Sequence, residues 1–147
     1  MSAEQSQESY DRVVAHQAKH GYCFFAAHHK EDDRFIGFIG LLNTSFEANF
    51  TPCVEIGWRL TPEYWGIGLA PEGAMACLDF AFSSLALEKV VSFTPTTNTP
   101  SQRVMQKIGM RQIDTFKHPL LKEGDPLELH VLYQITAAEF GAGRISG

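Results

Sequence analysis

The sequence predicts one α+β domain in which helices pack against a central sheet. In the middle of the chain, apolar residues alternate over residues 54–60 as in a strand with one apolar face. They then recur at three- and four-residue steps over 70–84, as in a helix. Two strand-like runs near the C-terminus, 111–117 and 127–135, flank a turn at 122–126 and predict an antiparallel pair. A length of 147 residues and a hydrophobic share of 44% suit one domain with an ordinary core.

The segments around these elements show the same mixture of strand and helix patterns. In chain order we expect a polar amphipathic helix over 5–19, strands over 22–28 and 34–42, a loop over 43–51, a strand over 89–94, a helix over 100–108 and a closing helical turn over 136–140. The loop carries Phe46 and Phe50. These rings could line a substrate cleft, or they could cover the edge of the core, which is the commoner role of loop aromatics.

The charge and cysteine content exclude several classes of function. Twelve Lys and Arg against 17 Asp and Glu give a net charge of −5, which argues against nucleic acid or an anionic membrane surface as a partner and suits a cationic substrate such as an amine. The cysteines, Cys23, Cys53 and Cys77, are widely spaced, so we expect reduced thiols in a cytoplasmic protein and no metal site. The polar start and the absence of a long apolar run predict neither a signal peptide nor a membrane span.

A glycine turn joins the central strand to the helix that follows it. Gly66 and Gly68 precede the helix, and Pro71 lies in its first turn, where a missing N–H costs nothing. Such a turn leaves several amides pointing the same way, and the helix dipole adds to their attraction for a phosphate or pyrophosphate. Turns of this kind also occur without a ligand. A dinucleotide fingerprint would need a glycine where Pro71 stands, and a Walker A loop would need Gly-Lys-Ser/Thr, which is absent.

Two motifs carry a family resemblance. Residues 65–72, Trp-Gly-Ile-Gly-Leu-Ala-Pro-Glu, resemble the pyrophosphate-binding motif of the GNAT superfamily of acetyl-CoA-dependent N-acetyltransferases, in its RimJ/RimL-type branch. Residues 98–110 resemble the second motif of that branch, and the segments 116–119 and 130–133 resemble its last two strands. The resemblance extends over residues 21–140, so we interpret residues 1–147 as a single N-acetyltransferase-like domain.

The resemblance implies a specific fold. It implies a three-layer α/β arrangement with a mixed, mostly antiparallel sheet that is splayed in the middle and has helices on both faces. Members usually begin with a further strand and helix, for which this chain has no residues, so the domain is expected to be N-terminally short. The strand at 22–28 would then have an uncovered edge, and we expect a homodimer or the helix at 5–19 to cover it.

The resemblance also implies acetyl-CoA as co-substrate, without a metal. The pantetheine arm would lie along the strand from Trp58 to Leu60, backbone amides would hold the pyrophosphate, and Arg103 could reach a CoA phosphate. Asn98 and Ser101 would contact the arm, although a turn residue and a helix cap are equally ordinary roles for them. The candidate acetyl-CoA-binding residues are Trp58, Leu60, Trp65, Gly66, Ile67, Gly68, Leu69, Ala70, Asn98, Ser101 and Arg103.

Three side chains are candidates for the general base. Glu55 has the opposite parity to Ile56 on the central strand, so it can face the cleft, where burial would raise its pKa. His118 and His130 are rivals because imidazole titrates near neutrality. A serine can act as the general acid in the branch that the chain resembles, and that serine is Ser101. Many relatives use a tyrosine instead, at the place that Met105 occupies here.

The resemblance therefore implies transfer of an acetyl group from acetyl-CoA to a primary amine by direct attack in a ternary complex. The acceptor would be a protein N-terminus or a small molecule. The alternative is a non-catalytic module that binds acyl-CoA or serves only for dimerisation.

Overall fold

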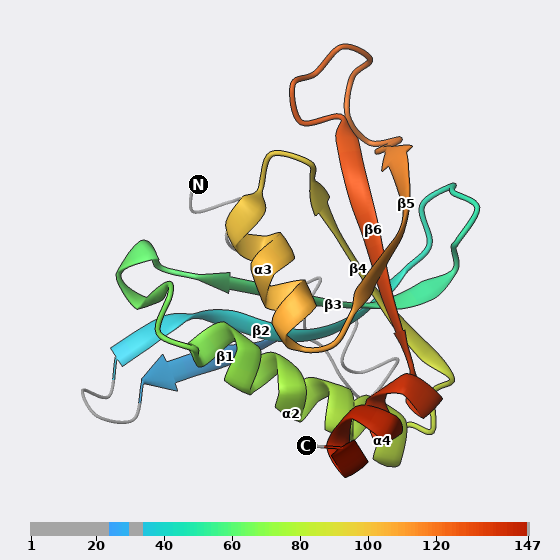
Figure 1. The fold of residues 1–147 in the computed structure, drawn as a ribbon. Helices are drawn as coiled ribbons and strands as arrows, with labels where there is room; N and C mark the ends of the chain where they lie inside the picture. The colour runs from blue at the N-terminus through green and yellow to red at the C-terminus, as the bar shows by residue number, and fades with distance from the viewer. Residues whose placement is uncertain (1–23, 30–33, 147) are drawn as a thin grey trace.

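The computed structural model describes residues 24–29 and 34–146, with side chains from 35 to 142. The elements, shown in Figure 1, are β1 (Phe24–His29), β2 (Arg34–Thr44), β3 (Cys53–Leu60), η1 (Pro62–Tyr64), α2 (Leu69–Ser83), β4 (Lys89–Pro95), α3 (Thr99–Lys107), β5 (Arg111–Lys117), β6 (Leu129–Thr136) and α4 (Ala137–Ser146). The helix predicted at 5–19 and the start of the strand predicted at 22–28 lie outside the described residues.

The strands form one sheet whose two halves diverge. Its order is β1-β2-β3-β4-β6-β5, and all neighbours are antiparallel except β3 and β4. β3 pairs with β2 as far as Leu60, and β4 pairs with β6 as far as Pro95, whereas β3 and β4 share only the pair Glu55–Val91. Figure 1 shows β1–β3 crossing the molecule while β4, β6 and β5 run steeply away from them. The predicted α+β fold, with a mostly antiparallel sheet splayed in the middle, is confirmed.

A side-chain hydrogen bond supports the short contact between β3 and β4. The hydroxyl of the buried Ser92 on β4 donates to the carbonyl oxygen of Ile56 on β3, at 2.8 Å. A buried carbonyl without a partner would destabilise the fold, so this bond secures the point from which the two strands separate.

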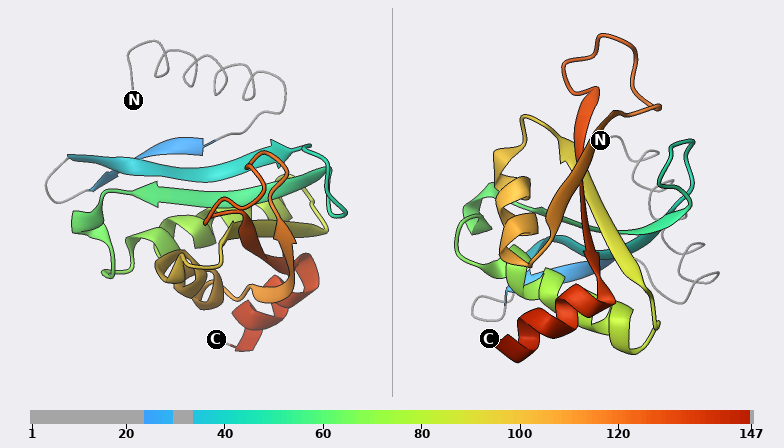
Figure 2. Two further views of the ribbon diagram at one scale, coloured as in Figure 1. Left: turned by 90° about the horizontal axis from the view of Figure 1, so that it is seen from above. Right: turned by 45° about the vertical axis from the view of Figure 1, so that its right-hand side comes forward.

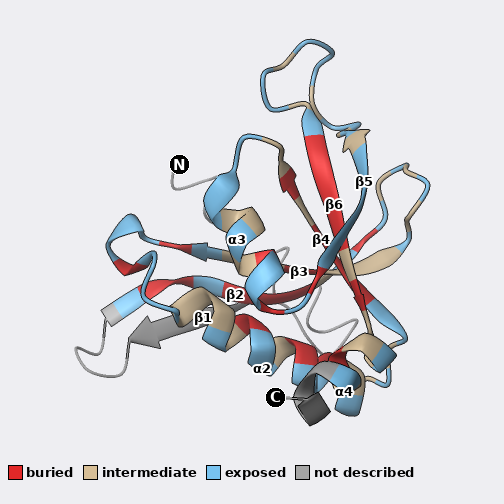
Figure 3. Ribbon diagram, viewed as in Figure 1, coloured by how far each residue is buried: buried red, intermediate tan, exposed pale blue. Residues whose placement is uncertain are grey.

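The described helices pack on one side of the sheet (Figure 2). On α2, Ala74, Leu78 and Ala81 recur at the helical spacing and are fully buried. Met105 of α3 and Phe140 of α4 join the same cluster, together with inward-facing residues of β2, β3, β4 and β6. Figure 3 shows the buried residues along β6 and on the inner side of α2. Helices were predicted on both faces, and the helix predicted at 5–19 is among the residues that are not described. None of the described helices is long and apolar enough to cross a membrane.

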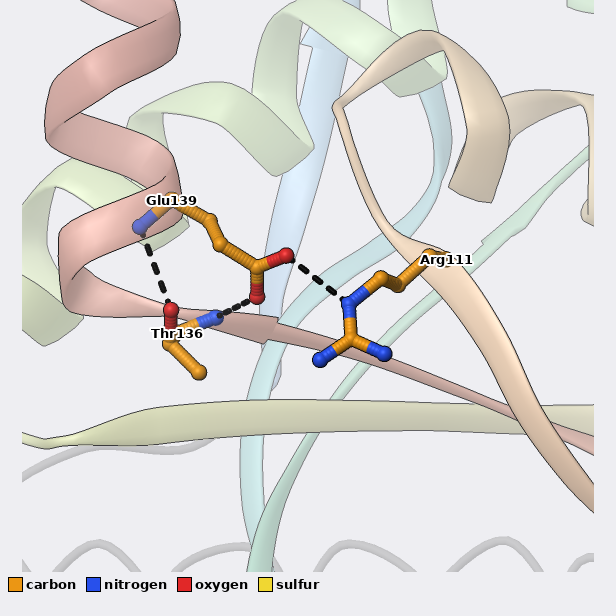
Figure 4. A network of polar contacts seen from close by, with 3 residues as sticks. All are labelled: Arg111, Thr136 and Glu139. Carbon is orange, nitrogen blue, oxygen red and sulfur yellow. Dashed lines mark hydrogen bonds and ion pairs between the residues drawn. The ribbon is translucent and has the colours of Figure 1, made fainter.

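The C-terminal helix is longer than the predicted closing turn. Thr136 and Glu139 form a reciprocal cap: the Glu139 N–H donates to Thr136 Oγ1 at 3.1 Å, and the Thr136 N–H donates to Glu139 Oε1 at 3.0 Å. Arg111 Nε on β5 donates to the other carboxylate oxygen at 2.8 Å and lowers the pKa of Glu139 (Figure 4). Other boundaries differ by two residues, since β2 continues to Thr44 and β6 begins at Leu129.

Gly37 permits a close approach between β2 and β3. Its φ is 145°, and a Cβ built there would lie 1.9 Å from the carbonyl oxygen of Arg59. Because Arg59 and its neighbour Leu60 belong to the end of β3 that borders the candidate site, this contact also sets the position of one wall of that site.

We predict that Gly37→Ala lowers the free energy of unfolding by about 3 kcal/mol or more, because a methyl group and a backbone oxygen cannot share that space. Gly124→Ala is the matched control, since Gly124 also has a positive φ, 87°, but no atom lies within 4 Å of a Cβ placed on its backbone. That control should cost only about 1 kcal/mol, the strain of the backbone alone. Urea denaturation measures the free energy of unfolding of both variants. Equal losses of stability in the two would contradict the close approach at Gly37.

Candidate active site

The glycine turn before α2 forms an open cradle of backbone amides. Gly66 and Gly68 have φ values of 75° and 87°, and no atom lies within 4 Å of a Cβ built at either. Gly68 is the N-cap of α2, and because it has no side chain, it cannot cap the free N–H groups of the first helical turn. The amides of Gly66, Ile67 and Gly68 make no hydrogen bond with another described group. These features suit a phosphate group better than a side chain.

A cleft of about 590 Å³, here called the outer cleft, lies beside this cradle. Its walls come from the end of β3, the turn into α2 and one side of α3. Its lining residues are Trp58, Arg59, Leu60, Tyr64, Trp65, Gly66, Gly68, Leu69, Ala70, Pro71, Asn98, Pro100, Ser101, Arg103, Val104 and Lys107. The charged ones, Arg59, Arg103 and Lys107, are all cationic, and no carboxylate lines the cleft among the described residues. This local charge favours the phosphates of a nucleotide, although the chain as a whole is acidic.

The outer cleft brings together ten of the eleven predicted acetyl-CoA-binding residues. The exception is Ile67, whose side chain does not line the cleft and is 60% exposed. Trp65 contributes its ring, and its Nε1 donates to the Leu60 carbonyl at 2.7 Å, which ties the turn to the end of β3. Sequence reasoning missed Arg59 and Lys107. Lys107 follows Arg103 by four residues, so helical spacing could have placed both on one side of α3.

A second cavity of about 350 Å³, here called the inner cavity, continues from the outer cleft. Trp58, Arg59, Asn98 and Ser101 line both. The other lining residues are Phe38, Glu55, Ile56, Gly57, Ser92, Phe93, Thr94 and Met105. Glu55 and Ile56 are neighbours on β3, so Glu55 lies on the face opposite Ile56. Met105 of α3 packs in the same cluster as Ile56, so the lining of the inner cavity comes from both faces of the sheet. It therefore passes through the opening between β3 and β4.

Asn98 and Ser101 meet at the junction of the two spaces. Asn98 is the N-cap of α3, and its Oδ1 accepts from the Ser101 N–H at 3.2 Å. This is the helix-capping role that the sequence analysis left open as an alternative, but it uses only the Oδ1 atom of the Asn98 side chain. The Asn98 Nδ2 group and the Ser101 hydroxyl make no hydrogen bond with a described group, so both can contact a ligand.

Glu55 carries the one carboxylate among the described residues that line the inner cavity. Burial raises its pKa to about 7. Thr44 lies on the same face of the sheet, because Leu42 pairs with Glu55 and Thr44 pairs with Cys53. The Thr44 hydroxyl is buried and has no hydrogen-bond partner of ordinary geometry among the described groups, yet it is near enough to lower the pKa of Glu55 against the larger effect of burial. We attribute this to proximity rather than to a formed bond.

The rival histidines lie in an aromatic cluster instead. This cluster comprises Phe46, Phe50, Phe93, Phe116, His118 and His130, and neither histidine lines either cavity. Burial lowers the pKa of both imidazoles. His118 Nδ1 accepts from the Leu120 N–H at 3.2 Å, and His130 Nδ1 donates to the Glu128 carbonyl at 3.2 Å, so each ring is engaged locally.

The chain belongs to the GNAT family of acetyltransferases, since the model of the acetyltransferase (GNAT) domain matches residues 1–111. A similar curated protein is the FsC-acetyl coenzyme A-N(2)-transacetylase of Aspergillus fumigatus, 35% identical over 96 residues, which cover 61% of this chain and 39% of that protein. The uncharacterized N-acetyltransferase YnaD of Bacillus subtilis is 36% identical over 88 residues, covering 60% of this chain and 49% of that protein. The chain thus spans about half or less of the length of these curated relatives.

Solved structures agree with the fold. A GNAT-family acetyltransferase from Bacillus anthracis is 30% identical with a TM-score of 0.64, covering 79% of this chain and 67% of that one. A ribosomal-protein-S5-alanine acetyltransferase from Vibrio fischeri is 21% identical with a TM-score of 0.69, covering 86% and 68%, and shares the fold. The GNAT family transfers acetyl groups from acetyl-CoA to amines. In the described part of the chain, no group of three or more His, Cys, Asp or Glu side chains could hold a metal ion.

We predict that Thr44→Val raises the pKa of Glu55 above about 7, because it removes a hydroxyl dipole that favours the ionised carboxylate without changing the size of the side chain. Thr44→Ser keeps the hydroxyl and should leave the pKa near the wild-type value. Carboxyl ¹³C chemical shifts followed over a pH titration give the value directly. An unchanged pKa in Thr44→Val would mean that Thr44 does not act on Glu55.

Proposed function

We propose that the protein transfers an acetyl group from acetyl-CoA to a primary amine by direct attack in a ternary complex. One observation carries this proposal: the outer cleft with its amide cradle and the inner cavity with its half-buried carboxylate share four lining residues. The outer cleft, whose charged lining residues are cationic, and the candidate base therefore border one continuous space.

We further propose that the protein falls in the RimJ/RimL-type branch. This proposal rests on the motifs at 65–72 and 98–110. Cytoplasmic location and a homodimer stay predictions. For the homodimer, β1 lies at an edge of the described sheet, where a partner strand could pair.

The residues of the outer cleft would bind and orient the co-substrate. The amides of residues 66–70 and the side chains of Arg103 and Lys107 would hold its phosphates, while Asn98 Nδ2 would donate to a carbonyl oxygen of its pantetheine arm. The end of β3 lacks a β4 partner beyond Glu55–Val91, so its backbone can pair with that arm instead. Acetyl-CoA supplies an activated acetyl thioester.

The residues of the inner cavity would handle the protons. Glu55 would take one proton from the acceptor ammonium, directly or through water, so that the neutral nitrogen bonds to the acetyl carbon and the carbon–sulfur bond breaks. The electron pair of that bond leaves on sulfur, and Ser101 would donate its hydroxyl proton toward the thiolate and regain one from the acetylated amine. Weak acid assistance suffices, since a thiol titrates near 8.5. A carboxyl pKa of about 7 suits a base at neutral pH.

A non-catalytic module that binds acyl-CoA is the second candidate. It is favoured by Met105, which lines the inner cavity at the place where many relatives have a tyrosine. Both candidates require binding in the outer cleft, and only the first requires Glu55.

We predict that acetyl-CoA at 100 times its Kd raises the melting temperature of the wild-type protein by roughly 5 to 10 °C, because it binds only the native state. Gly68→Val should abolish the shift, since its side chain would project into the phosphate cradle. Gly124→Val is the matched control: Gly124 has the same φ of 87° and equally open surroundings but does not line the outer cleft. A full shift in Gly68→Val would refute the pyrophosphate assignment.

For catalysis, we predict that Glu55→Gln lowers kcat by about 10²-fold while the Kd of acetyl-CoA changes little, because the amide cannot accept a proton. In the wild type, kcat/KM should rise with pH through about 7 as Glu55 ionises. His118→Ala is the comparison, and it should retain most of the activity because His118 lies outside both cavities. Full activity in Glu55→Gln together with inactive His118→Ala would transfer the role of base to His118.

A further inference from the structure

The inner cavity limits which amines the protein can accept, an inference that rests on the proposed function. We infer that the acceptor is a monoamine carried on a flat apolar body, such as an aromatic ring, and is not a polyamine. The lining on the Glu55 face consists of Phe38, Glu55, Gly57, Arg59 and Phe93. Two phenyl rings thus border the same space as one carboxylate, and Gly57 places no side chain between Glu55 and Arg59.

The aromatic cluster holds Phe93 in place. The centroid of the Phe93 ring lies 5.5 Å from that of Phe46, 5.8 Å from Phe50 and 5.7 Å from Phe116. His118 and His130 lie 5.9 and 6.2 Å from it. Contacts with rings from the β2–β3 loop, β5 and β6 leave Phe93 little freedom to rotate away. It is only half-buried, so one of its sides remains open to the inner cavity as a rigid apolar wall.

The charges of the inner cavity disfavour a second ammonium group. Glu55 is the sole acidic side chain among the described lining residues, and the proposed reaction uses it at the amine that is acetylated. Arg59 lines the same space and would repel a further cation. The lowered pKa values of His118 and His130 behind Phe93 favour their neutral forms, and a neutral imidazole offers no negative charge to a second ammonium. A ligand with one amine and an uncharged ring therefore matches the lining, whereas a polycation leaves charges without partners.

The test compares 2-phenylethylamine, n-butylamine and spermidine as acceptors, with release of the CoA thiol and the mass of the acetylated product as readouts. We expect kcat/KM for 2-phenylethylamine to exceed that for spermidine by at least about 10-fold, since spermidine leaves charges uncompensated and lacks the contacts with the phenyl rings. Phe93→Leu should lower the preference for 2-phenylethylamine over n-butylamine by about 3- to 10-fold, mainly through KM.

Phe80→Leu is the matched control, because Phe80 lies on α2, is 38% exposed and lines neither cavity. It should keep the wild-type preference. A thermal shift with acetyl-CoA that is retained in Phe93→Leu shows that this variant is folded. If spermidine is acetylated as efficiently as 2-phenylethylamine, or if Phe93→Leu keeps the wild-type preference, the inferred acceptor class is wrong while the proposed function stands. If acetyl-CoA binds but no amine in a wider panel is acetylated, the proposed function fails and the inference falls with it.

Discussion

The candidate site depends on the single cross-strand pair between β3 and β4. Each strand is held along its whole length by its outer neighbour, β3 by β2 and β4 by β6, so neither can bend to close the gap beyond Glu55–Val91. The hydrogen bond from the Ser92 hydroxyl to the Ile56 carbonyl fixes the strands where they meet, and residues of α2 and α3 pack against them in the core. The divergence leaves backbone groups of β3 without a strand partner at the place where the outer cleft and the inner cavity join. A ligand that can pair with a strand edge is the natural complement of such a gap.

Burial and local charge separate the two ends of this space chemically. The outer cleft collects cations and free amides beside a helix N-terminus, although the chain has a net charge of −5. The inner cavity is bordered by the rings of Phe38 and Phe93, and burial raises the pKa of Glu55 there to about 7. Net charge therefore indicated the sign of a candidate substrate, an amine, but not the cationic lining that would bind the phosphates. The cationic lining of the outer cleft and the raised pKa of Glu55 both depend on local geometry rather than on composition.

Local patterns predicted the elements and most of the site. Alternation along β3 put Glu55 on the face opposite Ile56, and the glycines at 66 and 68 marked the cradle, because both features depend only on neighbouring residues. The long-range register was not predictable. Phe116 faces His130, and Phe93 lies beside both, only because β5, β6 and β4 pair in one particular alignment. The assignment of His118 and His130 to a ring cluster, and of Arg59 to both cavities, therefore required the structure. The extent of α4 was missed because the local capping pattern of Thr136 and Glu139 marks only where the helix begins, not where it ends.

The proposed chemistry requires one continuous space through the sheet that joins the phosphate cradle to Glu55. The most direct measurement is a crystal structure of the protein with a non-hydrolysable acetyl-CoA analogue. We expect the pyrophosphate on the amides of residues 66–70, the pantetheine arm between β3 and β4, and the acetyl group in the inner cavity near Ser101 and Glu55. An analogue bound elsewhere, or bound in the outer cleft with its acetyl group directed away from the gap between β3 and β4, would contradict this path through the sheet.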